Sequence, residues 1–273
     1  MLGALVIVFR EVIEAGLIIG IVLAASREIP GNKRWVAFGV AGGIAGSVIV
    51  AIFAGAISDA FAGAGQELFN AGVLGTAVVM LTWHNVWMAR HSREIVMHMQ
   101  DVGAAVSAGT RPLTALGVVV GLAVLREGSE IVLFLYGVLA SGTSGASVLT
   151  GGIFGILVGA AFSALTYYGL LAIPLRHIFS VTSILIALLA AGMAAQAAQY
   201  LDSAGIVTVL GRQLWDTSGI LPQDSLIGRV LHTLIGYTDR PTELQLIVYV
   251  ATLIVMMLLM RIARPAQTMR VMA

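Results

Sequence analysis

Cysteine is absent from the 273 residues, and lysine occurs once, at Lys33. The lack of cysteine excludes disulfides, thiolate metal sites and redox-active cysteine pairs. Charged residues are scarce as well, at 11% of the chain against about 25% in typical soluble domains. Hydrophobic residues make up 59%, and neither the net charge of +1 nor any basic cluster indicates nucleic-acid binding. Because so little polar surface cannot cover a water-soluble globule, the composition predicts an integral membrane protein.

Long apolar runs divide the chain into segments that suit membrane-spanning helices, which need roughly 20 residues. The runs are expected at about 3–26, 35–58, 68–89, 112–140, 148–172, 178–201 and 244–261. Barrel strands are excluded by length, because they span about 10 residues with alternating polarity. The first run is not interpreted as a signal peptide, since no basic segment precedes it and charged residues interrupt it. The sequence therefore predicts an all-α integral membrane protein with seven transmembrane helices in a single membrane domain, 1–273.

Basic residues are unevenly divided among the connections. One alternate set carries Arg27, Lys33, Arg34, Arg90, Arg93, Arg111, Arg176, Arg261, Arg264 and Arg270. The other set is poor in them: 59–67 and 141–147 carry none, and in 202–243 three arginines are outnumbered by five acidic residues. The positive-inside rule places the basic set in the cytoplasm. The N-terminus is then outside and the C-terminus inside, which an odd number of spans requires.

Two connecting segments have helical features of their own. The stretch 224–236 has apolar residues at roughly helical spacing, which fits an amphipathic helix on the membrane surface or over the bundle, or else a packed loop. The stretch 89–103 is expected to form a short amphipathic helix on the inner side.

The same charged motif, Arg-Glu-x-x-Glu, interrupts two of the apolar runs. "REVIE" begins at Arg10 and "REGSE" begins at Arg126, 116 positions later. The same offset brings two glycines of the second run onto two glycines of the fifth: Gly39 and Gly43 onto Gly155 and Gly159. Three spans separate the motifs, so the second copy enters the membrane from the opposite side. This predicts a 3+3 inverted repeat plus one helix, with its site near the midplane. The parts are repeat one at about 3–89, repeat two at about 112–201, an outer loop at about 202–243 and a seventh helix at about 244–261.

The spacing of the motif places its charged groups on one helical face. Two such helices running in opposite directions bring together four carboxylates, Glu11, Glu14, Glu127 and Glu130, with Arg10 and Arg126 beside them. A charge at the bilayer centre costs at least ~2.5–3.5 kcal/mol, so a purely structural ion-pair network is the less favoured alternative. Two arginines and four ionised glutamates leave two negative charges, which a divalent cation neutralises. Carboxylate ligands suit iron, manganese, magnesium or calcium, and zinc also binds them; the residues alone leave the metal open.

"REVIE" and "REGSE" resemble the paired Arg-Glu-Gly-x-Glu motifs of the oxidase-dependent iron transporter family, which includes the fungal high-affinity iron permease and bacterial EfeU-type permeases. "LWDTSGIL" (214–221) and "LIGYTDRP" (234–241) are similar to the bacterial branch. Val12 stands where the family usually has glycine, and Ser129 where an aliphatic residue is usual. The resemblance implies iron uptake across the bacterial inner membrane, with iron as the transported substrate and no bound organic cofactor. It also implies periplasmic partners that oxidise or deliver iron: a cupredoxin-like protein and a haem peroxidase.

Five further polar residues are candidates for the ion pathway: Glu67, His84, Asn85, Gln199 and Asp216. His84 and Asn85 either line an exit path, toward the cytoplasmic end of the third span, or bond neighbouring helices. Three other function classes compete with iron transport. A transporter of another divalent cation, such as manganese or lead, would need the same carboxylates. A metal-dependent intramembrane enzyme is disfavoured because no span has a histidine pair at i, i+4. A receptor has no need of mirrored charged motifs, and a retinal protein needs a lysine within a helix, whereas Lys33 lies in a connection.

Overall fold

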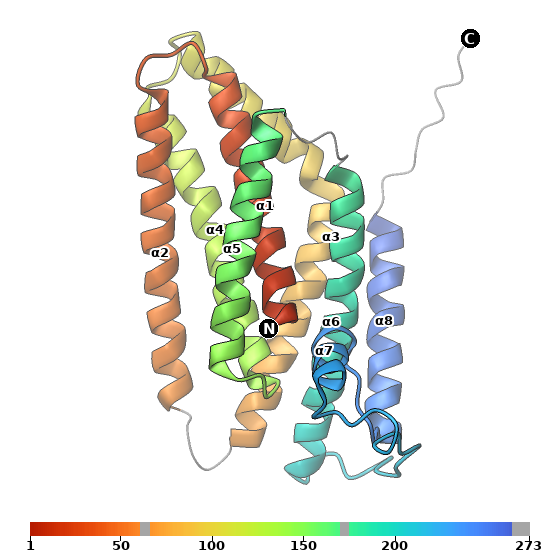
Figure 1. Cartoon of the computed structure of the whole chain (residues 1–273). Helices are drawn as coiled ribbons and strands as arrows, with labels where there is room; N and C mark the ends of the chain where they lie inside the picture. Colours follow the sequence, from red (N-terminus) through yellow and green to blue (C-terminus); the bar gives the residue numbers. More distant parts are fainter. Residues whose placement is uncertain (61–65, 170–174, 264–273) are drawn as a thin grey trace, which may run out of the picture.

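The computed structural model describes residues 1–60, 66–169 and 175–263. These residues form the helices α1 (Leu2–Ala25), α2 (Asn32–Ala60), α3 (Gln66–Ser107), α4 (Thr114–Ala140), α5 (Gly145–Tyr167), α6 (Leu175–Ser203), α7 (Leu226–Ile235) and α8 (Glu243–Ala263) (Figure 1). No β-strand occurs in the described ranges, where a single isolated bridge joins Gln213 and Thr242. The predicted all-α class is confirmed. Each predicted span overlaps one long helix, α1 to α6 or α8.

The structure corrects the prediction for one connecting segment and decides between the two alternatives for another. The stretch 89–103 is not a separate short helix, because α3 continues through it as a helix of 42 residues. Loss of hydrophobicity marks the end of an apolar run, but good helix formers such as Arg90 and Glu94 keep the backbone helical. For 224–236 the helical alternative holds: Ser225 caps α7 by accepting from the N–H of Gly228, and Gly236 ends it at φ 69°. The helix α7 packs over the bundle, against α6 and α1.

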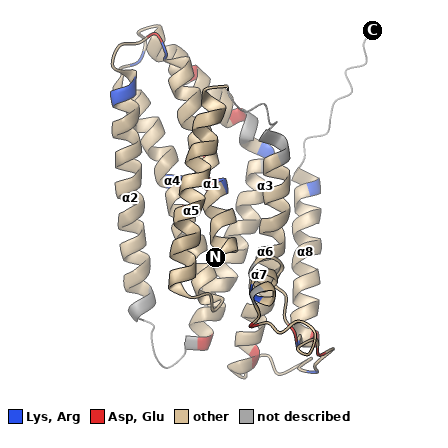
Figure 2. Ribbon diagram, viewed as in Figure 1, with Lys and Arg blue, Asp and Glu red and all other residues tan. Residues whose placement is uncertain are grey.

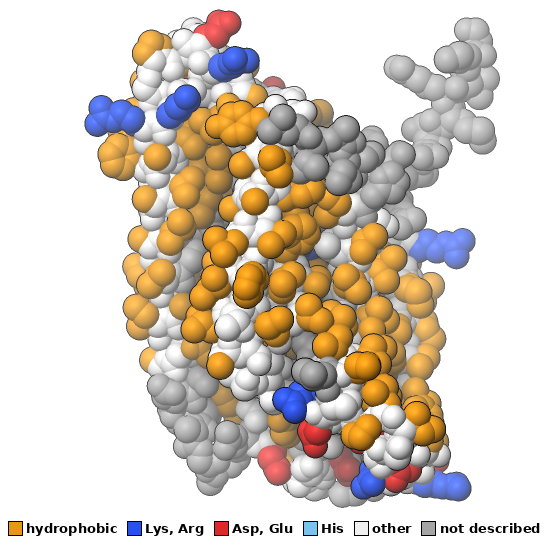
Figure 3. All heavy atoms as spheres, viewed as in Figure 1, with side chains coloured by type: hydrophobic (Ala, Val, Ile, Leu, Met, Phe, Trp, Pro, Cys, Tyr) orange, Lys and Arg blue, Asp and Glu red, His pale blue; other side chains and the backbone are white. Residues whose placement is uncertain are grey.

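Apolar character runs through the long helices. In α2, α5, α6 and α8 the segments Asn32–Ile57, Gly145–Tyr167, Ile178–Ser203 and Glu243–Ala263 are long and apolar enough to cross a membrane. The helices α1 and α4 match them in length but each carries an arginine and two glutamates. In the space-filling view, apolar side chains cover the length of the helices and charged ones gather at the two ends (Figure 3). The bundle therefore has the surface of a multi-pass membrane protein.

The two motif helices, α1 and α4, lie at the centre of the bundle and run in opposite directions (Figure 1). Their packing is reciprocal: α1 packs most extensively on α5, and α4 on α2. The first helix of each predicted repeat thus packs on the second helix of the other. The third helices, α3 and α6, pack on each other, and α8 packs on α6.

Glycine allows both of these helix pairs to approach closely. Gly155 of α5 lies against Val8 of α1. Val124 of α4 follows Val8 by 116 positions, and it lies against Gly43 of α2. A constant offset of 116 would instead place Gly39, the counterpart of Gly155, against Val124. The two pairs therefore pack alike, but with a displacement of four residues, about one helical turn, relative to that offset. The connection from α4 to α5 is also shorter than that from α1 to α2, so the second helices begin at different points.

This packing predicts an unequal response of two helix glycines to alanine. A Cβ atom at Gly155 would lie 2.8 Å from Cβ of Val8 and 2.9 Å from the carbonyl oxygen of Leu5, so the two helices must separate. We expect Gly155→Ala to lower the melting temperature in detergent, with overpacking of this kind costing about 1–3 kcal/mol. Gly75→Ala in α3 is the matched control, because nothing lies within 4 Å of its Cβ position and alanine favours helix. Equal melting temperatures for the two variants would contradict this account.

Candidate metal site between the crossing helices

The motif of α1 is fully enclosed. Arg10, Glu11 and Glu14 have exposed fractions of 2%, 0% and 3%. Arg10 lies one helical turn before Glu14, and Nε of Arg10 donates to Oε1 of Glu14 at 2.9 Å. Its Nη1 donates at 2.7 Å to Oδ1 of Asn85 on α3. The fork of Arg10 therefore ties one glutamate of α1 to a neighbouring helix and leaves Glu11 unbound by it.

The motif of α4 repeats one of these contacts but in a different setting. Nε of Arg126 donates to Oε1 of Glu130 at 3.1 Å and lies 3.7 Å from Oε1 of Glu127. The guanidinium of Arg126 stacks over the ring of Trp87, 4.3 Å from its centroid, as a cation–π pair. The side chain of Arg126 is 37% exposed, against 2% for Arg10. The two arginines therefore bind the glutamate at the same position of each motif, but Arg10 is buried and Arg126 is partly exposed.

His84 of α3 enters the space between the two motifs. Its Nε2 lies 3.6 Å from Oε2 of Glu11 and 3.6 Å from Oε2 of Glu14, and its Nδ1 contacts the carboxylate of Glu130. The ring is 4% exposed and packs edge-on against Phe134 at a centroid distance of 6.2 Å. The imidazole is thus held among carboxylates that come from both motif helices.

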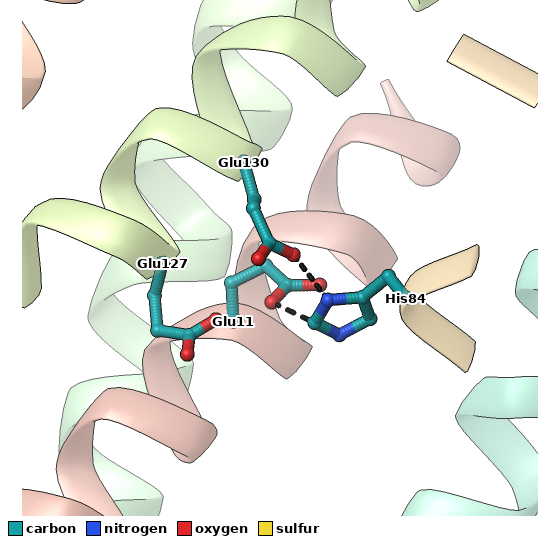
Figure 4. A group of neighbouring side chains, drawn as sticks. All are labelled: Glu11, His84, Glu127 and Glu130. Atoms are coloured by element: carbon teal, nitrogen blue, oxygen red, sulfur yellow. Dashed lines mark ion pairs between the residues drawn. The ribbon is translucent and has the colours of Figure 1, made fainter. Parts of the chain in front are cut away.

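Four side chains of this group converge within the reach of one ion. Glu11, His84, Glu127 and Glu130 each offer an oxygen or nitrogen atom, and these atoms lie within 4.8 Å of one another (Figure 4). Both carboxylate oxygens of Glu11, Nε2 of His84 and Oε2 of Glu127 are buried without a hydrogen bond in the described structure, whereas Nδ1 of His84 and Oε2 of Glu130 contact each other. Buried polar atoms that lack partners are costly. A cation bound among them would satisfy most of these atoms at once.

The structure brings together three of the four glutamates that the sequence predicted as ligands. Glu14 lies beside the group, but one of its oxygens is held by Arg10. His84, which the sequence offered only as a pathway candidate, lies at the centre. The sequence placed His84 toward the end of a third span that was expected to stop near residue 89, whereas α3 continues to Ser107, so His84 lies in mid-helix. The sequence did contain a feature that could have indicated a ligand here, namely a histidine within an apolar run.

The remaining pathway candidates lie apart from this group. Glu67 is exposed in the first turn of α3, about 25 Å along the helix from His84 at 1.5 Å per residue. Gln199 accepts a hydrogen bond from Gln245 at 2.9 Å. Asp216 lies in the segment between α6 and α7, where hydrogen bonds from Ser218 hold its pKa below the usual value and Arg240 pairs with it. Their part in a pathway stays a prediction.

Two cavities border the group and are lined by different residues. The larger, about 680 Å³, lies among α1, α2, α4 and α5 and is lined by Glu11 and Glu127. The other, about 410 Å³, is lined by His84, Glu130 and Arg126 together with side chains of α3. The carboxylate and imidazole groups thus line both cavities.

An apolar helical bundle with ionisable side chains at its centre and cavities beside them defines a class, the multi-pass membrane transport proteins. The model of the iron permease FTR1 family matches residues 1–270, and the chain belongs to this family. This confirms the resemblance found in the sequence and the prediction of a transporter rather than an enzyme.

Several curated relatives are similar over almost the whole chain. The chain is 31% identical over 252 residues to the ferrous iron permease EfeU of Escherichia coli O6:K15:H31, covering 91% of both chains. The same figures hold for the ferrous iron permease EfeU of Shigella sonnei. The protein of that name from Yersinia pestis is 29% identical over 252 residues, 91% of this chain and 89% of the relative. No solved structure matches the chain.

Proposed function

We propose that this protein imports iron across the bacterial inner membrane and binds the ion at the midplane between Glu11, Glu127, Glu130 and His84. One observation carries the proposal: a buried group of carboxylates and an imidazole with unpartnered atoms, in a member of an iron permease family. The relatives from Escherichia coli and Yersinia pestis are named ferrous iron permeases, which supports iron as the substrate.

The donor set supports a transition metal more than magnesium or calcium. Carboxylates accept many divalent cations, whereas imidazole suits iron, zinc, copper and nickel and is unusual for magnesium or calcium. Charge balance also favours a cation. Arg10 and Arg126 offset two of the four motif glutamates, and an ion of charge +2 offsets the remaining two. Glu14 then serves as a partner of Arg10 and as a neighbour of His84.

The proposed membrane arrangement has seven crossing helices, α1 to α6 and α8, as a 3+3 inverted repeat plus one. The opposite directions of α1 and α4 and the reciprocal packing of α1 with α5 and α4 with α2 support it. The orientation, N-terminus outside and C-terminus inside, is supported by the basic residues Arg27, Lys33 and Arg34 at one end of the bundle (Figure 2). The basic residues Arg264 and Arg270 lie outside the described residues.

Iron oxidising or delivering proteins, a cupredoxin-like protein and a haem peroxidase, would meet this protein on its outer side. The connection between α6 and α8, residues 204–242, is the longest one between the proposed spans, and it includes α7. Its acidic side chains, Asp216, Asp224 and Asp239, suit the reception of a cation.

The two motif arginines are expected to respond unequally to lysine. Arg10 uses two nitrogens at once, one for Glu14 and one for Asn85, and an ammonium cannot reproduce this planar fork. Arg126 donates to Glu130 through Nε alone; its Nη2 meets only the weak acceptor Sδ of Met88 at 4.0 Å, and its guanidinium stacks on the ring of Trp87. We expect Arg10→Lys to lower iron uptake about tenfold or more, and Arg126→Lys to lower it less. Uptake per folded molecule, measured in proteoliposomes, checks the order; wild-type uptake by both variants would refute it.

The proposal is tested with the full chain in proteoliposomes. Purified protein is reconstituted, and accumulation of iron, manganese, zinc, lead and magnesium is measured against empty liposomes. We expect iron to accumulate, and magnesium to be excluded. Preferential accumulation of manganese or lead would favour the second candidate, a transporter of another divalent cation that uses the same carboxylates. No accumulation of any metal by folded protein would refute transport by this chain alone.

A further inference from the structure

The larger cavity extends from the buried carboxylates toward one end of the bundle only. Along α1 its lining runs from Glu11 to Leu23, and along α5 from Ile156 to Tyr168. These are the halves of the two helices that lead to the end of the bundle at which α2 begins, which is the inner end in the proposed orientation (Figure 1). On α2 and α4 the lining is confined to their middle portions. Along the bundle axis the cavity thus opens toward one end only, and between α2 and α5 it also reaches the side of the bundle, where Ile44, Val48 and Ile156 are about half exposed.

Most of the cavity wall is aliphatic, and its polar side chains are few. They are Glu11, Ser47, Glu127, Ser163, Tyr167 and Tyr168. These six residues do not lie at one depth. Glu11 and Glu127 belong to the ion site, and the two tyrosines mark the inner end of α5.

Ser163 follows Ser47 by 116 positions, but the two serines lie at different depths in the cavity. The reason is the four-residue displacement between the packing of α5 on α1 and that of α2 on α4. Ser47 of α2 lies against Gly128, directly after Glu127, so it stands at the level of the carboxylates. Its Oγ donates to the carbonyl of Gly43 at 2.9 Å. Ser163 of α5 lies against Gly16, five residues beyond Glu11 or about 7.5 Å along α1. Ser163 is therefore a step nearer the inner end.

The hydroxyl of Ser163 is unused in the described structure. Its Oγ is buried and has no hydrogen-bond partner. By contrast, Oγ1 of Thr166 on the same helix donates to the carbonyl of Phe162 at 2.9 Å, the usual way in which a helix satisfies a hydroxyl. A buried hydroxyl without a partner, on the wall of a cavity that holds two carboxylates, is suited to a ligand that supplies the missing interaction.

We propose that this cavity is the inner water-filled exit of the iron pathway and that Ser163 is the hydroxyl ligand that receives the ion after Glu11 and Glu127. The inference rests on the proposed function. A cation that leaves two carboxylates for an aliphatic cavity loses its ligands, and oxygen donors along the wall offset that loss. Ser163 supplies such a donor between the site and the tyrosines at the inner end. The opposing outcome is that a lipid acyl chain fills the aliphatic cavity, which would leave it dry.

The absence of cysteine from the chain makes the exit directly testable. Ser163→Cys is exposed to a charged, membrane-impermeant methanethiosulfonate reagent in inside-out vesicles and in right-side-out spheroplasts. We expect modification from the inner side only, because charged reagents follow water. Leu165→Cys is the matched control: it lies two residues away on α5, is 41% exposed and does not line the cavity, so it faces lipid and stays unmodified. Ala160→Cys, a second cavity position with a mild change in size, guards against a folding defect at residue 163.

The labelling result decides the inference independently of transport. Failure of both cavity cysteines to react from the inner side, with folded protein, would show a dry or lipid-filled cavity and overturn the proposal. Reaction from the outer side only would overturn it as well. Absence of iron uptake by the wild-type protein would instead refute the proposed function, whatever the labelling shows.

A flux measurement tests the role of the hydroxyl itself. Ser163→Ala is expected to lower the maximal rate of iron uptake about fivefold, the equivalent of one lost polar interaction, while iron binding at the carboxylate site is unchanged. Thr166→Ala, whose hydroxyl is already satisfied by the backbone, is expected to transport like the wild type. Equal rates for Ser163→Ala and the wild type would remove Ser163 from the pathway. A loss of rate accompanied by weaker iron binding would place Ser163 in the carboxylate site itself and overturn its role as a separate step.

Discussion

Glu11→Gln and Glu127→Gln are each expected to lower iron uptake at least about tenfold per folded molecule. Glutamine keeps the size of the side chain and its capacity for hydrogen bonding, but it removes one negative charge and one strong ligand. Glu11 is fully buried and neither of its oxygens has a hydrogen-bond partner, so an ion is the partner that the proposed site gives it. Glu127 is almost as buried, at 2% exposed, and lies in the same ligand group.

Glu14→Gln is expected to have a smaller effect on uptake and a larger one on stability. One oxygen of Glu14 already accepts from Arg10, so the substitution weakens a buried ion pair more than it removes a ligand. The measurement is uptake in proteoliposomes, with the melting temperature in detergent recorded for each variant. Glu11→Asp and Glu127→Asp add a test of reach, since each keeps the charge but withdraws the carboxylate. If Glu11→Gln, Glu14→Gln and Glu127→Gln were all to transport normally per folded molecule, the motifs would be scaffolding.

The helices themselves were readable from the sequence because a membrane imposes a simple rule on them. An apolar run long enough for the hydrocarbon core must be helical there to satisfy its backbone. The α1 and α4 segments were found on this rule in spite of their charges. The rule fails where a helix leaves the membrane: α3 continues past its apolar run, since helix propensity does not depend on hydrophobicity.

The convergence of the motifs followed from spacing, but their individual roles did not. Helical periodicity places Glu11 and Glu14 on one face, yet it does not say which one Arg10 holds. That choice depends on Asn85, which reaches Arg10 from a helix 75 positions away in the sequence. The unequal exposure of the two arginines likewise arises from packing, because Arg126 stacks on Trp87 of α3 and still remains 37% exposed. Contacts between distant helices leave no pattern in a single sequence.

The constant offset between the two halves was also an incomplete guide. It aligns the two Arg-Glu-x-x-Glu motifs in the sequence, but Gly43 rather than Gly39 packs on α4 as Gly155 packs on α1. A change in the length of a connection shifts every later residue, and glycine-rich helices accept several registers because small residues recur along them. The displacement also matters for the proposed exit of the ion, because it places Ser47 and Ser163 at different depths in the cavity.

His84→Gln is expected to lower iron uptake about 100-fold or more, because loss of a direct ligand costs a metal site at least as much as loss of a partner that supports a ligand. His84 is the one nitrogen ligand in the group and contacts carboxylates of both motif helices. The matched control is His91→Gln, one heptad further along α3. His91 stacks on Trp87 and bonds to its carbonyl oxygen, outside the ligand group, so its loss leaves the site intact. Uptake per folded molecule distinguishes the two; equal uptake by His84→Gln and His91→Gln would exclude His84 as a ligand.

The choice among metals gives the sharper test of His84. Removal of the imidazole leaves a ligand set of carboxylate oxygens, which favours manganese and magnesium relative to iron. His84→Gln is therefore expected to lower the ratio of iron to manganese uptake, in addition to the total. A structural role for the ring, in packing against Phe134, predicts a different pattern: a lower melting temperature with the metal preference unchanged. Competition between iron and manganese in the same proteoliposomes separates the two, because a ratio does not depend on how much protein is folded. An unchanged ratio in the folded variant would assign His84 to packing and leave the proposed site to its carboxylates.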